Sequence, residues 1–127
     1  MTIEYHEPPQ ELSQRTRELH RAYTTLVEEI EAVDWYQQRV DVTADEEMAH
    51  VLRHNRDEEM EHAAMTLEWI RRNEPTFAEQ LQTYLFTSAP ITEIEDEAEQ
   101  GGDGAANSDA AASDSDLGIG KFHKFTR

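Results

Sequence analysis

A polar interruption in the middle of an apolar helical stripe constrains the fold most. Over residues 43–73, apolar side chains recur alternately four and three positions apart, which is the period of one face of an α-helix. The stripe is apolar from Met48 onward and again up to Ile70, but Glu59 and His62 occupy its centre. Burying an unpaired carboxylate is costly, so this helix must bring its polar centre against suitable partners.

A second acidic residue lies beside the apolar stripe of a preceding helix, expected over residues 10–40. This stripe follows a seven-residue repeat, with Ile30 and Tyr23 among the residues between its members. At about 100° per residue, Glu29 falls about 60° from the centre of the stripe, at its edge. Tyr36 lines up with Glu29, and we expect it either to pack in the core or to hydrogen-bond a liganding carboxylate. The repeat consists of Leu12, Leu19, Leu26, Val33 and Val40.

The three residues Glu29, Glu59 and His62 match half of a known metal-ligand set. The spacing Glu59-x-x-His62 places both groups on one helix face, about one turn apart. Di-iron carboxylate bundles use two Glu-x-x-His motifs and two further glutamates. The chain offers one of each, so two copies would complete such a site. The alternative is a polar layer that only fixes the register of helix pairing.

Composition limits the classes of function. The chain has 127 residues, enough for one domain, and its net charge of −17 argues against a nucleic-acid partner. It contains no cysteine, which excludes disulfides and iron–sulfur clusters. Residues 1–10 lack the apolar core of a secretory signal, and no run of about 20 apolar residues spans a membrane. A cytoplasmic protein is therefore expected.

The order of helices and breaks predicts an all-α fold. Thr43, with Glu46 three residues on, is expected to cap the second helix, so that two long helices form an antiparallel hairpin. Pro75 is expected to open a short third helix that ends near Phe86. Residues 1–90 thus form one helical half-domain, which would dimerise into a four-helix bundle.

Beyond the helices, the composition changes twice. Residues 91–116 are rich in Asp, Glu, Gly, Ala and Ser and contain no Lys or Arg, so we expect a disordered acidic linker. Residues 117–127 follow as an apolar and basic ending. Leu117, Ile119 and Phe122 are expected to be the anchors with which this ending docks into a partner's groove.

Two further groups of side chains lie away from the apolar stripes. Glu28, Glu31 and Trp35 share the face of the first helix opposite its core stripe. A solvated acidic face is the simplest interpretation, with a partner contact or an ion-collecting site as the alternative. His54 falls on the far side of the second helix, near Glu58, and is expected to be a solvated residue.

Three stretches of the sequence resemble the encapsulated ferritins, which are ferritin-like iron oxidases carried as cargo in encapsulin nanocompartments. The stretches are Glu-Glu-Ile-Glu-Ala-Val-Asp-Trp-Tyr at residues 28–36, the long run at residues 54–72, and Thr-Tyr-Leu-Phe at residues 83–86. The resemblance covers nearly the whole part expected to fold. It implies a dimer with a shared four-helix site and a ring-shaped homo-oligomer built from such dimers.

The resemblance also implies roles for individual residues. The family's di-iron ligands match Glu29, Glu59 and His62, with Tyr36 counted among the catalytic residues. Its peripheral metal site matches Glu28, Glu31 and Trp35, which favours the ion-collecting interpretation of that face.

The ending resembles an encapsulin-targeting peptide. It departs from the usual small-polar-then-Leu pattern at Lys121 and Phe122, which bears on shell specificity. The expected function is therefore oxidation of Fe(II) to Fe(III) for iron storage inside an encapsulin shell. The alternatives are a non-catalytic acidic helical adapter and a structural metal-bridged dimer.

Overall fold

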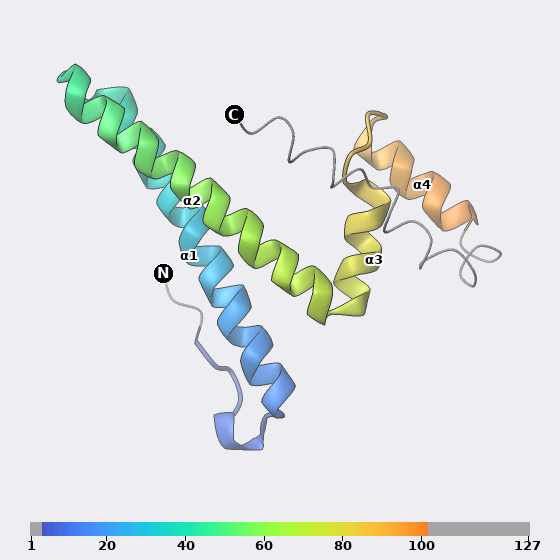
Figure 1. Cartoon of the computed structure of the whole chain (residues 1–127). Helices are drawn as coiled ribbons and strands as arrows, with labels where there is room; N and C mark the ends of the chain where they lie inside the picture. Colours follow the sequence, from blue (N-terminus) through green and yellow to red (C-terminus); the bar gives the residue numbers. More distant parts are fainter. Residues whose placement is uncertain (1–3, 102–127) are drawn as a thin grey trace. The chain divides into compact units, whose positions relative to one another are not determined.

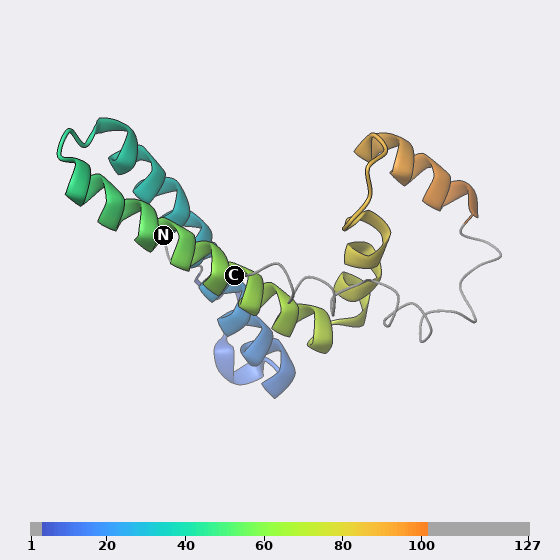
Figure 2. The same cartoon turned by 45° about the horizontal axis from the view of Figure 1, so that its top comes forward.

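Two long antiparallel helices form the main body of the protein. The computed structural model describes residues 4–101. The chain divides into two compact units, with the boundary between Ala78 and Glu79. α1 (Gln14–Val42) and α2 (Glu46–Asn73) belong to the first unit and lie side by side (Figures 1 and 2). Because only residues 43–45 join them, the chain reverses at once. The expected all-α fold with a helical hairpin is confirmed.

Short polar side chains fix where the two long helices begin. The Ser13 hydroxyl accepts a hydrogen bond from the Thr16 amide at 3.0 Å, and the Asp45 carboxylate accepts one from the Met48 amide at 2.7 Å. The expectation that Thr43 caps α2 is wrong. Thr43 ends α1 instead, where its hydroxyl donates to the Arg39 carbonyl at 2.6 Å. Asp45 directly precedes α2, and its charge also suits the positive end of the helix.

The chain before α1 is a short arm. α1 begins later than expected, because Pro9–Glu11 form a separate 3₁₀ turn, η1, before the Ser13 cap. Upstream of this turn, the Tyr5 ring stacks on His20 of α1, with the ring centres 4.0 Å apart. This stacking holds the arm against α1.

The buried core is small and lies near the two ends of the hairpin. Leu19 and Ile70 are buried near one end, and Ala49 and Leu52 are buried near the interhelical turn. Between these pairs, the described stretches of α1 and α2 contain no buried side chain. Half-buried side chains therefore make up the middle of the interface between α1 and α2.

Part of the expected buried stripe is exposed. Met48 is 49% exposed and Trp69 is 41% exposed, although both lie on the apolar stripe of α2. Glu59 and His62, at its centre, are half-buried. A two-helix hairpin covers one face of each helix only, so a stripe wider than that contact retains an exposed edge. The hairpin alone therefore leaves part of the stripe uncovered.

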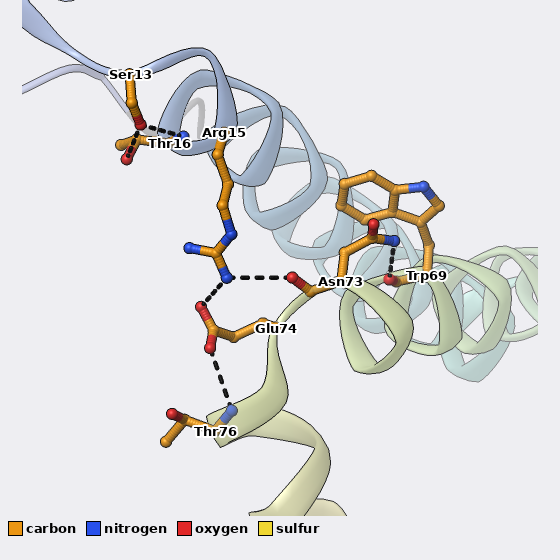
Figure 3. A network of polar contacts seen from close by, with 7 residues as sticks. All are labelled: Ser13, Arg15, Thr16, Trp69, Asn73, Glu74 and Thr76. Atoms are coloured by element: carbon orange, nitrogen blue, oxygen red, sulfur yellow. Dashed lines mark hydrogen bonds and ion pairs between the residues drawn. The ribbon is translucent and has the colours of Figure 1, made fainter.

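A polar network joins the start of α1 to the junction of α2 and α3 (Pro75–Tyr84). Arg15 donates to the Asn73 carbonyl at 3.1 Å and to the Glu74 carboxylate at 2.9 Å (Figure 3). The other oxygen of Glu74 accepts from the Thr76 amide at 3.2 Å. Helix α3 ends two residues earlier than expected, shortly before Phe86, whose φ of 62° is incompatible with a continuing helix.

The second unit corrects the expected boundary of the linker. Residues 91–116 were expected to be without regular structure, but α4 spans Ile91–Gly101. The Pro90 carbonyl accepts from the Glu93 amide at 3.0 Å, and Glu93 places a negative charge in the first turn. Glutamate and alanine are also good helix formers, which offsets the low hydrophobicity of this segment. The remainder of the linker and the ending with Leu117, Ile119 and Phe122 lie outside the described residues.

Candidate metal centre

The two long helices bring Glu29, Glu59 and His62 together. Glu29 is on α1, while Glu59 and His62 are one turn apart on α2. Nδ1 of His62 lies 3.4 Å from the Glu59 carboxylate and 3.6 Å from the Glu29 carboxylate. One ligand atom from each residue falls within 4.8 Å of the others. A single small cation could therefore contact all three residues.

The cluster lies at the edge of the hairpin, open on one side. The side chains of Glu29 and Glu59 are 21% and 24% exposed, whereas that of His62 is 41% exposed. On α2, the exposed apolar side chains of Met65 and Trp69 follow on the same side of the helix as His62. The open side of the cluster is thus bordered by apolar surface.

The carboxylates of the cluster have no competing basic partner. Within residues 4–101, arginines form ion pairs with other acids, such as Asp57 with Arg56 and Glu68 with Arg71. Glu29 and Glu59 instead face each other and His62. Two like charges at this distance are unfavourable, and a bound divalent cation would relieve that repulsion.

The proton affinities of the cluster reflect this crowding. The pKa of Glu29 is raised, first because its carboxyl shares a hydrogen bond with Glu59 and then because burial disfavours its charge. For His62, partial desolvation works to lower the pKa, but the hydrogen bond to Glu59 and the nearby carboxylates outweigh it, so the pKa is raised. The crowding thus favours the protonated forms of both Glu29 and His62.

The donor set fits a first-row transition metal. Carboxylate oxygens together with one imidazole suit Fe(II), Mn(II) or Zn(II), and no thiolate is present anywhere in the chain. Three protein ligands leave positions open on the metal. The donor set of one chain is therefore that of a half-built carboxylate–histidine centre.

Tyr36 and the expected peripheral residues lie outside this cluster. Tyr36 is half-buried, and the Arg39 guanidinium lies 5.4 Å above the centre of its ring. Trp35 is 49% exposed and lines a shallow surface hollow of about 540 Å³ with Gln38, Arg39 and Val42. Glu28 is exposed and Glu31 is half-buried, and the described residues show no metal-sized cluster that contains either of them.

A second acidic group was missed at the sequence level. Glu58, Glu61 and His62 also place one potential ligand atom each within 4.8 Å of the others. His54 lies 3.4 Å from Glu58 across one helical turn and is exposed, as expected. The i, i+3 spacing of Glu58 and Glu61 next to His62 is visible in the sequence, but glutamate is so abundant in α2 that the spacing alone does not single out this group.

Comparison with known proteins identifies the family. The family model described as EncFtn-like matches residues 4–88, which include α1, α2 and α3. The chain belongs to the EncFtn-like family. The resemblance drawn from the sequence is therefore confirmed, and the matched region contains Glu29, Glu59 and His62.

Named EncFtn-like relatives match over most of their length. The chain is 56% identical to the encapsulated ferritin-like protein of Rhodospirillum rubrum over 120 residues, which are 92% of this chain and 86% of that protein. It is 54% identical to the ferritin-like protein of Thermotoga maritima over 122 residues, 96% of this chain and all of that one.

A solved structure extends the likeness to three dimensions. The crystal structure of protein ne0167 from Nitrosomonas europaea superimposes with a TM-score of 0.68 at 58% identity and covers 70% of this chain and 98% of that one. Within the described part of this EncFtn-like chain, none of the helices combines the length and apolarity needed to cross a bilayer.

Proposed function

We propose that this protein is a ferroxidase that oxidises Fe(II) to Fe(III) at a centre shared by two copies of the chain. The convergence of Glu29, Glu59 and His62 at the open edge of the hairpin carries the proposal. Each copy contributes two carboxylates and one imidazole, and a two-fold pairing of the exposed edges doubles this set. The result is the ligand inventory of a di-iron carboxylate bundle.

The chemistry follows from the donor set. Two Fe(II) ions held side by side would each give one electron to dioxygen. Dioxygen would take up two protons and become hydrogen peroxide, and both ions would become Fe(III). Negative carboxylates stabilise the higher charge of Fe(III) more than that of Fe(II), which favours oxidation. Glu59 lies at the centre of the α2 stripe, and it is the residue that we propose would be shared by the two metals.

The names of the relatives support the biological setting. One is an encapsulated ferritin-like protein and another is a ferritin-like protein. We therefore propose iron storage within a cytoplasmic encapsulin nanocompartment, with Leu117, Ile119 and Phe122 as the contacts to the shell. The chain would assemble as a dimer and then as a ring of dimers. The exposed residues Glu28 and Trp35, with Glu31, would form a peripheral site that collects cations.

Oxidation of Fe(II) by purified protein tests the proposal. We expect the native chain to oxidise Fe(II) with consumption of oxygen, and Glu29→Ala, Glu59→Ala and His62→Ala each to lose most of this activity. The losses should not add, because the residues act as a unit. Glu47→Ala, at an exposed acid in the first turn of α2, removes the same charge as Glu29→Ala and Glu59→Ala and is their control.

Mass measurement in parallel separates the alternatives. A shared centre binds metal only in the associated state, so added Fe(II) should shift the population towards larger species. Metal-driven association without oxygen consumption would instead indicate a structural metal-bridged dimer. If the protein neither binds metal nor oxidises Fe(II), the acidic helical adapter is the alternative that remains.

A further inference from the structure

A second polar bridge links α1 and α2 beside the candidate metal centre. Arg56 of α2, whose side chain is 20% exposed, donates from Nη1 to the Gln37 side-chain oxygen of α1 at 2.5 Å. The other edge of its guanidinium donates to Asp57 from Nε and Nη2, at 3.0 Å and 2.7 Å. The Gln37 amide nitrogen in turn donates to Asp41 at 2.8 Å. Asp57 and Asp41 thus orient the two side chains that form the bridge.

The bridge adds a directed polar contact in a stretch of the hairpin where the described side chains are at most half-buried. Arg56 is three residues from Glu59 on α2, which is slightly less than one helical turn. This stretch of the hairpin lies between the two buried ends, Leu19 with Ile70 and Ala49 with Leu52. Apolar contacts tolerate small axial shifts, whereas a directed hydrogen bond does not. Buried polar pairs are well documented as devices that fix helix register.

The bridge also keeps the positive charge of Arg56 away from the metal ligands. Its guanidinium is paired with Asp57, so it does not occupy the carboxylates of Glu29 or Glu59. At the far end of the hairpin, the Arg15 contact with the Asn73 carbonyl joins the same two helices. The candidate centre is thus flanked along the hairpin by one polar bridge on each side.

We infer that Arg56 and Gln37 are positioning residues for the metal centre: their bridge sets the axial register at which Glu29 of α1 meets Glu59 and His62 of α2. This inference rests on the proposed centre but not on its oxidation chemistry. A slip of α1 by one residue would displace Glu29 by about 1.5 Å and turn it by about 100°, which would remove it from the cluster.

Co(II) binding to the full chain tests the inference without iron oxidation. We expect Arg56→Met and Gln37→Met each to weaken Co(II) binding by about tenfold or more, the effect typical of residues that orient metal ligands. Both should also change the visible absorption of the bound Co(II), because the coordination geometry changes. The double variant should bind no more weakly than the weaker single variant, since one bridge is lost in each case.

Two controls separate positioning from general stability. Leu52→Ala removes a buried side chain without touching the bridge, and it should lower the melting temperature while Co(II) affinity and spectrum stay native. Arg53→Met removes an exposed arginine of α2 and should alter neither. Arg56→Lys keeps the charge but loses the forked geometry, so it should resemble Arg56→Met.

The outcomes are distinguishable. Native Co(II) affinity and spectrum in the Arg56 and Gln37 variants would overturn the inference and leave the centre intact. A loss of affinity equal to that of Leu52→Ala at the same melting temperature would also overturn it, because stability alone would then explain the loss. Failure of the native chain to bind Co(II) would refute both the centre and its positioning.

Discussion

At the scale of single residues, the raised pKa values of Glu29 and His62 have opposite consequences with and without metal. A raised pKa means that folding favours the protonated form, so the stability it contributes is complete below the unfolded pKa and is lost as the pH rises through the folded one. For Glu29 and His62 the ordinary values are 4.5 and 6.5. We expect the stability advantage of Glu29→Gln over the native chain to grow as the pH rises, in the presence of chelator. The difference in melting temperature between the two proteins, followed from below pH 4.5 to above pH 6.5, measures this advantage. A difference independent of pH would contradict it.

Metal reverses this dependence, because a cation competes with the protons of the same groups. Affinity for Co(II) should therefore increase as the pH rises through the raised pKa values of Glu29 and His62. Calorimetry in buffers of different ionisation enthalpy should show proton release on binding. Binding without proton release would indicate that the metal uses other ligands.

The exposed face of α1 carries a prediction about rate. If Glu28 and Glu31 collect cations, Glu28→Gln with Glu31→Gln should slow Fe(II) oxidation by a few-fold at low salt and by less at high salt, because salt screens surface charge. The maximal rate at saturating Fe(II) should change little. Glu46→Gln with Glu47→Gln, in the first turn of α2, is a matched control for net charge. Equal effects of the two double variants would indicate that this face of α1 is an ordinary solvated surface.

At the scale of elements, the junction of α1, α2 and α3 depends on one ionised carboxyl. The pKa of Glu74 is lowered, first by the hydrogen bond from Arg15 and then by the Thr76 amide. A lowered pKa gives stability that is present above the ordinary value of 4.5 and is lost as the pH falls through the lowered one. We expect Glu74→Gln to speed hydrogen exchange at Thr76 at neutral pH, with a smaller difference at acid pH. Unchanged exchange at both would show that the network of Figure 3 does not hold the start of α3.

Elements differed in how far the sequence could predict them. The apolar periods of α1 and α2 were sufficient to predict both helices, because a long helix repeats its pattern many times. The Glu-x-x-His spacing was sufficient to place Glu59 and His62 on one helix face. Thr43 and Asp45 are both good caps, and only the three-dimensional turn decides between them. Helix α4 was missed because a low apolar content was taken to exclude order, although helix propensity acts locally.

The Arg56–Gln37 bridge was beyond sequence reasoning for a related reason. Its partners are 19 residues apart, and their pairing depends on how α1 and α2 lie against each other. The partial exposure of His62 was likewise unpredictable. Periodicity shows which face of a helix is apolar, but not how much of that face a neighbouring helix covers.

At the scale of the whole molecule, the ending should govern location and not chemistry. Deletion of residues 117–127 removes the proposed anchors Leu117, Ile119 and Phe122 but leaves α1 and α2 untouched. Purified ferroxidase activity should therefore be unchanged, while co-purification with a co-expressed encapsulin shell should be lost. Ile119→Asp should act almost as strongly, because a charge is costly to bury in an apolar pocket. Packaging of the truncated chain would show that the targeting signal lies elsewhere in the chain.

The proposed division of the ligands between two chains has a consequence for timing. If two copies share the centre, an unpaired chain holds only half of the ligand set, in Glu29, Glu59 and His62. Below the dissociation constant of the dimer, the number of centres, and so the initial velocity, should rise with the square of the chain concentration. Iron oxidation per chain would then rise as synthesis raises the chain concentration, and dilute chains released from a broken compartment would lose activity without any inhibitor.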